Sequence, residues 1–313
     1  MRKVVYLVRA LPGGVPERLR GIVDLRGGGA RPPPRERLQE EARGADILAV
    51  SYLDRVDEAL LAALPSVRQV SSYGVGVNHI DLDACRRRGV AVTNTPDVLT
   101  DATADMAMAL LLAAARRVCE GDRLIRAGGW RENLPDFHLG KEVHGRVLGI
   151  VGFGRIGQAV ARRARGFRMP ILYAEPRDVA FEGARRVSLD ELLAGSDYVS
   201  LHCPLTDATQ NLVSRERIAQ MRPGAVLVNT SRGPVVDEEA LAEALESGHL
   251  FAAGLDVFRD EPRVPERLRR LENVVLSPHV GSGTVETRQA MARLVWEELE
   301  RAAAGQPPAH PVP

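Results

Sequence analysis

The chain has 313 residues, 42 lysines and arginines against 41 aspartates and glutamates, 45% apolar residues and 4% aromatics. This balance is typical of a globular protein and excludes a disordered chain, a collagen and a protein directed mainly at nucleic acid. The length predicts about two domains, each able to bury a core of its own.

Three widely spaced cysteines, Cys85, Cys119 and Cys203, form no CxxC pair. They indicate free thiols in a reducing compartment, so we expect neither a zinc site nor a dithiol site. The opening apolar run is too short for a signal sequence, and no run reaches the length of a membrane helix. We therefore expect a cytoplasmic protein with no membrane or nucleic-acid partner.

The first hundred residues alternate short apolar runs with helical stretches. The pattern predicts strands at 3–8, 47–51, 67–71 and 90–93, with helices at 57–64 and 81–88. Glycine and proline runs at 27–29 and 32–34 indicate surface loop. Such alternation is typical of a parallel sheet covered by helices.

A different pattern begins at residue 100, where a helix is predicted to run to 117 with apolar residues on every face from 106 to 115. Such a helix must be buried all round, at a domain junction or a subunit interface. After a loop at 127–139, strands are predicted at 147–151, 171–175, 198–201, 226–229, 253–255 and 274–276, with helices at 156–164, 189–194 and 238–246 among them. Six strands with intervening helices predict a doubly wound sheet. The proline-rich segment 306–313 is expected to be a tail.

The segment 152–157 reads GFGRIG and fits the pattern G-x-G-x-x-G between a predicted strand and a predicted helix. Glycines at Gly152, Gly154 and Gly157 would allow a tight turn and close approach to a pyrophosphate at the helix N-terminus. Glu175 follows the next strand, where it could accept hydrogen bonds from a ribose. Its charge would repel a 2′-phosphate, so NAD is favoured. Arg177 could pair with that phosphate, which leaves NADP as the alternative.

Three polar residues stand out farther along the chain: Arg232, Glu261 and His279. Arg232 directly follows a strand, in the crevice where ligands bind in this architecture, and its planar guanidinium suits a carboxylate. Each residue alone has an ordinary explanation, as a surface arginine, a loop glutamate beside Asp260 and a hydrogen-bonded loop histidine.

Together with other segments, these residues resemble the D-isomer-specific 2-hydroxyacid dehydrogenases. The segments that carry the resemblance are SYGVGVNHID at 72–81, NTP at 94–96, HCPLT at 202–206, NTSRG at 229–233 and SPH at 277–279. The resemblance covers nearly the whole chain except the first fifty residues and the tail. It implies an oxidoreductase that interconverts a 2-oxo acid and a D-2-hydroxy acid with NAD or NADP.

The family's catalytic set corresponds to Arg232, Glu261 and His279. Arg232 would bind the substrate carboxylate, protonated His279 would give a proton to the oxyanion that develops on hydride transfer, and Glu261 would hold the histidine in place. The resemblance also implies substrate contacts from the loop Gly74, Val75 and Gly76 and from Ser282.

Further cofactor contacts are implied at residues that follow strands or begin a helix: Arg155, Ile156, Pro204, Thr209, Thr230 and Asp256. The family architecture is two Rossmann-like lobes in an α/β fold. It implies a flavodoxin-like substrate domain made of residues 1–98 and 283–313, into which a doubly wound NAD-binding domain of residues 99–282 is inserted. A homodimer is implied as well, with the apolar helix 101–117 at its interface.

Within the family, segments 94–105 and 128–130 are most similar to glyoxylate and hydroxypyruvate reductases, many of which use NADPH, whereas Glu175 argues for NADH. D-3-phosphoglycerate, 2-ketogluconate and D-lactate-type dehydrogenases stay open as alternatives. So does a non-enzymatic NAD-sensing protein of the corepressor kind. A methyltransferase or hydrolase would explain the glycine loop but would leave Arg232 and His279 without roles.

Overall fold

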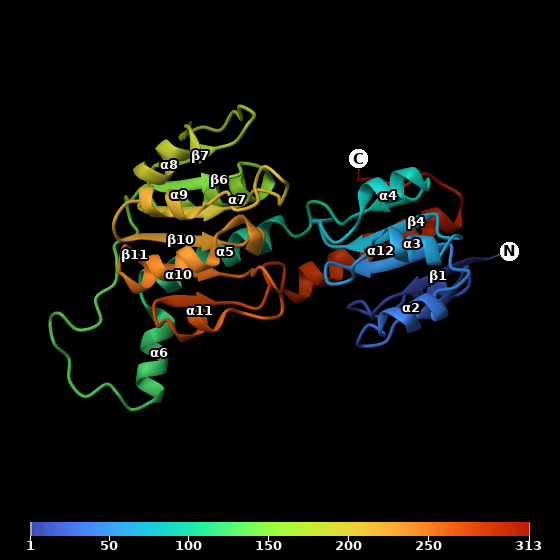
Figure 1. Ribbon diagram of the computed structural model, residues 1–313, viewed down its shortest axis with the longest axis horizontal. Coiled ribbons are helices and arrows are strands. Elements are labelled where there is room, and N and C mark those ends of the chain that lie inside the picture. The colour runs from blue at the N-terminus through green and yellow to red at the C-terminus, as the bar shows by residue number, and fades with distance from the viewer. Residues whose placement is uncertain (1, 313) are drawn as a thin grey trace. The chain divides into compact units, whose positions relative to one another are not determined.

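The computed structural model describes residues 2–312. Backbone contacts divide the chain into two compact units, Met1–Leu99 with Gly283–Pro313 (unit 1) and Thr100–Ser282 (unit 2). Each unit has a parallel sheet covered by helices (Figure 1). The expected α/β class is therefore confirmed.

The sheet of unit 1 has five parallel strands in the order β2-β1-β3-β4-β5. The strands are β1 (Lys3–Leu7), β2 (Val23–Gly27), β3 (Ile47–Ser51), β4 (Gln69–Tyr73) and β5 (Ala91–Thr93). This is the flavodoxin-like order. Strands β3 and β4 are buried along their whole length, as expected when helices cover both faces of a parallel sheet.

Five helices belong to unit 1: α1 (Glu17–Arg20), α2 (Arg35–Glu41), α3 (Glu58–Ala63), α4 (Leu82–Arg87) and α12 (Val285–Ala303). Asp57, Asp81 and Thr284 cap α3, α4 and α12, because each side chain accepts a hydrogen bond from a backbone N–H in the first turn. Helix α12 packs against β4, so the C-terminal segment completes the unit that the N-terminal segment begins.

The sheet of unit 2 has seven parallel strands in the order β12-β11-β10-β9-β6-β7-β8. The strands are β6 (Leu148–Val151), β7 (Ile171–Ala174), β8 (Ala184–Arg186), β9 (Tyr198–Leu201), β10 (Ala225–Asn229), β11 (Leu250–Leu255) and β12 (Val274–Leu276). The strand order reverses between β6 and β9. In a doubly wound sheet, ligands bind at this switch point, beyond the carboxyl ends of the strands.

Two apolar layers cover the two faces of this sheet. One contains residues of α8 (Leu189–Gly195), α9 (Arg215–Gln220), α10 (Glu238–Glu246) and α11 (Glu266–Arg270). The other contains residues of α5 (Thr100–Ala115) and α7 (Arg155–Ala164). Short 3₁₀ turns, η1 (Arg165–Phe167) and η2 (Gly233–Val235), and the surface helix α6 (Val118–Arg126) complete the unit.

The strands and helices predicted from the sequence are all present, with bounds that move by up to three residues. The elements that sequence reasoning missed are short or polar: β2, β8, α1, α2, α6, α9 and α11. Strand β8 reads Ala-Arg-Arg and lies at a sheet edge, where nothing demands an apolar pattern.

The apolar helix α5 is largely buried within its own unit. It packs against α7, β10 and β11 of its own unit, where Gly254 lets the β11 backbone approach Leu110 closely. Its composition therefore requires no subunit interface.

Within residues 2–312, no helix combines the length and the apolar character that crossing a bilayer requires.

The proline-rich C-terminal segment is anchored rather than loose. Val312 donates its backbone N–H to Val92 O at 2.8 Å, beside an antiparallel bridge between Thr93 and Pro311. The buried carboxylate of Glu298 on α12 accepts the backbone N–H of His310 at 2.8 Å and that of Ala309 at 3.1 Å. The His310 ring nitrogen Nδ1 lies 2.9 Å from the same carboxylate.

We expect Glu298→Ala to lower the free energy of unfolding of the chain by about 3 kcal/mol, since it removes a buried acceptor that serves several donors at once. Chemical denaturation measures this change. The exposed neighbour Glu297→Ala is the matched control and should change it by less than about 0.5 kcal/mol. Equal effects of both substitutions would show that the carboxylate does not anchor the segment.

Candidate functional site

The glycine loop at residues 152–157 joins β6 to α7 at the switch point of the unit 2 sheet. Gly152 has φ +86°, and a Cβ added there would lie 2.5 Å from the backbone nitrogen of Cys203. A Cβ at Gly157 would lie 2.3 Å from Gly152 O, whereas one at Gly154 would meet open space. Two of the glycines therefore close the turn, and the third leaves its outer side accessible.

The N-terminus of α7 suits an anion. Gly154 is the N-cap and offers no side chain to the first N–H groups of the helix, which carry partial positive charge. Arg155, exposed, and Ile156 are the first two residues of the helix. An open glycine at an uncapped helix start is what a dinucleotide pyrophosphate requires, so these residues fit the cofactor that the motif predicts.

Glu175 follows β7 and lies against the glycine loop. Its Oε2 accepts the N–H of Phe153 at 2.9 Å. Phe153 is buried and stacks on Tyr173 with ring centroids 4.1 Å apart, which fixes the loop. A carboxylate has two oxygens, so Glu175 can hold the loop and still accept from a ribose hydroxyl.

The carboxylate of Glu261 and the imidazole of His279 form a direct pair. Glu261 Oε2 lies 2.6 Å from His279 Nδ1, and Glu261 Oε1 accepts the N–H of Phe258 at 3.0 Å. Burial favours a higher pKa for Glu261, but the contacts with His279 and the Phe258 amide and the charge of Arg232 hold its pKa below the usual value. Glu261 is therefore a carboxylate at neutral pH.

Asp256, which is buried after β11, shapes the turn that carries His279. Its two carboxylate oxygens accept the N–H groups of Val280 at 2.9 Å and Gly281 at 2.7 Å, and its carbonyl accepts the His279 N–H at 2.8 Å. His279 has φ +53°, a left-handed conformation that costs free energy for a residue with a side chain. Asp256 holds the backbone there.

Arg232 follows β10 and is half-buried. Its Nη1 donates to Ser231 O at 2.6 Å, and its own carbonyl accepts from the amide of Asn229 at 3.0 Å. Gly233, the next residue, packs directly on the segment that leads to Glu261, because a Cβ there would lie 1.9 Å from the carbonyl carbon of Phe258. The two loops therefore touch through their backbones.

His202 is a residue of this region to which sequence reasoning gave no role. It follows β9, its Nε2 lies 2.8 Å from Ser200 Oγ, and its Nδ1 lies 3.4 Å from the hydroxyl of Thr230. Burial lowers its pKa to about 3, so the ring is neutral at ordinary pH and fixes the Thr230 side chain by hydrogen bonding. The segment HCPLT was noticed in the sequence, but pattern alone does not show which way a side chain points.

Pro204 and Thr209 lie in one loop after β9. The Thr209 hydroxyl donates to Pro204 O at 2.6 Å and accepts the Thr206 N–H at 2.7 Å. In the structure the threonine thus serves the shape of its own loop.

The predicted substrate loop Gly74–Val75–Gly76 follows β4 and belongs to unit 1. Gly74 O accepts the N–H of Thr95 at 3.1 Å, and Val75 O accepts from the Asn94 amide at 2.8 Å. The segment NTP at 94–96 therefore holds this loop in place. Ser282 is the last residue of unit 2 and is half-buried.

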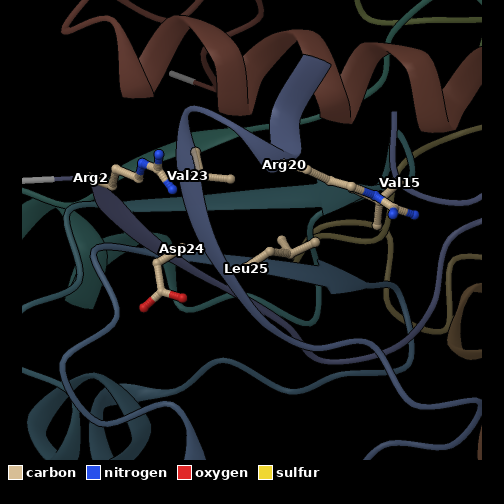
Figure 2. A pocket seen from close by; sticks show the side chains of 6 residues that line it. All are labelled: Arg2, Val15, Arg20, Val23, Asp24 and Leu25. Carbon is tan, nitrogen blue, oxygen red and sulfur yellow. The ribbon is translucent and has the colours of Figure 1, made fainter. Parts of the chain in front are cut away.

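A cavity of about 660 Å³ lies elsewhere, along the edge strand β2 of unit 1 (Figure 2). It is lined by Arg2, Val15, Arg20, Val23, Asp24 and Leu25. None of these is a candidate site residue.

Comparisons with known proteins identify the family of the chain. Residues 108–281 match the family model for the NAD-binding domain of D-isomer-specific 2-hydroxyacid dehydrogenases. The chain is 47% identical to a glyoxylate reductase of Thermococcus litoralis over 284 residues, 88% of this chain and 86% of that one.

Solved structures are similar over the whole length. A protein of Thermus thermophilus is 44% identical with a TM-score of 0.94, over 99% of this chain and 100% of that one. An NADPH-dependent glyoxylate/hydroxypyruvate reductase of Sinorhizobium meliloti, solved with NADP and malonate, is 33% identical with a TM-score of 0.87, over 100% of this chain and 97% of that one. The chain belongs to the D-isomer-specific 2-hydroxyacid dehydrogenase family and is an oxidoreductase that uses NAD or NADP.

Proposed function

We propose that the chain reduces glyoxylate and hydroxypyruvate to the corresponding hydroxy acids. The observation that carries this proposal is the 2.6 Å pair of Glu261 and His279, with Arg232 on a loop packed against the segment that holds Glu261. These three groups supply an acid, its orienting carboxylate and a cation for a carboxylate substrate. The relatives named as reductases of these two acids favour them over other 2-oxo acids.

The residues divide the chemistry between them. When bound, a reduced nicotinamide supplies the hydride that goes to the 2-carbon of the substrate. His279 donates its Nδ1–H to the ionised Glu261, so the proton that can move sits on Nε2. The protonated ring gives that proton to the oxygen that gains negative charge, and the neutral ring takes it back in the reverse reaction.

Substrate orientation falls to Arg232 and to unit 1. The guanidinium would bind the substrate carboxylate, and the backbone N–H groups of Val75 and Gly76 are proposed as further donors for it, since the Gly74 N–H donates to Ser72 O at 3.1 Å. Unit 1 thus acts as the substrate domain and unit 2 as the NAD-binding domain, with Ser282 near the point where the chain passes from one to the other. Pro204, Thr209, Thr230 and Asp256 lie after strands of the sheet on which the nicotinamide half of the cofactor would bind.

We expect His279→Ala to lower kcat for glyoxylate reduction by about 10²–10⁴-fold, because the oxyanion loses its proton donor. Glu261→Gln should also lower kcat, whereas Arg232→Ala should mainly raise the KM for the oxo acid. NADH consumption measures all three. The exposed residues His144→Ala and Arg269→Ala are matched controls that should retain the wild-type rate.

Substrates of the alternative dehydrogenases belong in the same assay: 3-phosphohydroxypyruvate, 2-ketogluconate and pyruvate. A preference for one of them would replace the proposed substrate and keep the residue roles. Tight NADH binding without turnover of any acid would contradict the enzymatic proposal and favour an NAD-sensing binding protein.

Cofactor preference depends on charge at the end of β7. The carboxylate of Glu175 repels the 2′-phosphate of NADPH, and the Arg186 guanidinium, which could otherwise pair with that phosphate, donates to Glu175 O and Pro176 O. We therefore propose NADH as the preferred form.

We expect Glu175→Gln to improve kcat/KM for NADPH by about tenfold, because the substitution removes the negative charge that would repel the 2′-phosphate in a partly solvent-exposed site. Steady-state kinetics with both cofactors measures this. Glu182→Gln, an exposed acid in the same region, should leave the preference unchanged. An unchanged preference in Glu175→Gln would assign cofactor choice to other residues.

We propose further that the protein is a cytoplasmic homodimer. Helix α6 and the following loop extend from the sheet of unit 2 (Figure 1). They expose a group of large apolar side chains, here called the α6 apolar patch: Val118, Ile125, Trp130, Leu134, Phe137 and Leu139. Several large apolar side chains exposed in one segment favour an interface there, and a second copy of the chain is its proposed partner. The three free cysteines fit a reducing compartment.

Sedimentation velocity tests the dimer. We expect the wild-type chain to sediment as a dimer and the double variant Ile125→Asp, Trp130→Asp to sediment as a monomer, because two charges would be buried at the interface. The substitution Ile22→Asp, at an exposed residue of unit 1, is the control and should leave the dimer intact. A monomeric wild-type chain would overturn the proposal.

A further inference from the structure

The loop that carries Glu261 is tied to the loop that carries Arg232 by more than packing. At Gly233 the two backbones meet, and a Cβ there would lie 2.3 Å from the nitrogen of Arg259. That same nitrogen donates its hydrogen to Glu238 Oε1 at 2.7 Å. Glu238 is the first residue of α10, in the element that follows the Arg232 loop. The segment that follows Arg232 therefore binds the segment that precedes Glu261 through one backbone amide.

The Arg259 side chain returns the contact. Its Nη2 donates to Asn211 Oδ1 at 2.6 Å and to Val236 O at 3.2 Å. Asn211 in turn donates its backbone N–H to Pro234 O at 2.8 Å. Arg259 is thus held at its amide by Glu238 and at its guanidinium by the segment 211–236, and it cannot move without breaking both contacts.

The neighbouring amide connects this anchor to the acid–base pair. Phe258 N–H donates to Glu261 Oε1, and Glu261 Oε2 contacts His279 Nδ1 at 2.6 Å. Two carboxylates from separate segments therefore hold two successive amides. A shift of the Arg259 amide would carry the Phe258 amide with it and change where Glu261 presents its second oxygen.

Keeping the carboxylate of Glu238 ionised costs free energy in the folded chain. Burial raises its pKa, the Arg259 amide and guanidinium partly oppose that rise, and the charges of Asp260 and Glu261 add to it. Burial and the two neighbouring acids therefore oppose ionisation of Glu238, and the hydrogen bond from the Arg259 amide to its Oε1 is the contact that offsets this cost.

We propose that Glu238 is a positioning residue, which through the Arg259 amide sets the geometry of the Glu261–His279 pair. It touches neither the substrate nor the cofactor in this role. The proposal rests on the proposed function for its effect on turnover, but the geometry it asserts exists in the chain without substrate.

Steady-state kinetics of three variants gives the first test. Glu238→Ala removes the acceptor, and we expect kcat to fall by about tenfold or more, since small displacements of catalytic groups are costly, with KM values changed by less than about threefold. Glu238→Gln keeps an acceptor oxygen and should restore kcat to within about threefold of wild type. Glu239→Ala, in the next residue, removes an exposed acid that pairs with Arg267 and should leave kcat unchanged.

Proton NMR gives a second reading without turnover. The Nδ1–H proton in the Glu261–His279 hydrogen bond should give a low-field resonance, identified by its loss in Glu261→Gln. We expect this resonance to shift or disappear in Glu238→Ala and to remain in Glu238→Gln and Glu239→Ala. Melting temperatures of all variants show whether each is folded.

The outcomes separate the two proposals. A wild-type kcat and an unshifted resonance in Glu238→Ala would overturn the positioning role, as would Glu238→Gln being as impaired as Glu238→Ala. Suppose that the wild-type chain reduces none of the tested acids, but that the resonance shifts in Glu238→Ala and not in Glu238→Gln or Glu239→Ala. The proposed function then fails and the positioning role stands.

Discussion

The contact between Glu261 and His279 is the interaction on which the rest of the site depends. A carboxylate on Nδ1 assigns the transferable proton to Nε2 and sets the direction in which the ring faces. Glu261 remains ionised because contacts with His279 and with a backbone amide outweigh the cost of burying it. The Phe258 amide and the contact at Gly233 hold the loop of Glu261, and Asp256 holds the turn of His279.

Much of that work is done by backbone rather than by side chains. Gly233 lets two loops touch, Gly152 lets the glycine loop pass Cys203, and Asp256 satisfies the amides of a turn that places His279 at a positive φ. Each is a local constraint at the carboxyl end of a strand. A parallel sheet brings these ends together at one edge, so residues distant in sequence share a site.

The sequence was sufficient for the fold because its strong signals coincide with buried elements. Strands such as 47–51 and 198–201 are mostly apolar and are buried along their whole length, and the GFGRIG loop stands between a strand and a helix. The polar edge strand β8 and the amphipathic helix α6 lacked such a signal. Roles that depend on side-chain direction could not be predicted. The contact of the His202 ring with the Thr230 hydroxyl and the hydrogen bond from the Arg259 amide to Glu238 follow from tertiary packing alone.

The anchored C-terminal segment has a consequence for how the sheet of unit 1 ends. A bare edge strand offers unpaired N–H and C=O groups to any other strand, which favours aggregation. Strand β5 would be such an edge, but the segment around Pro311 lies along it. Because proline has no N–H to donate, this covering segment is itself a poor template for another strand. The sheet is therefore closed to further strand pairing at its β5 edge.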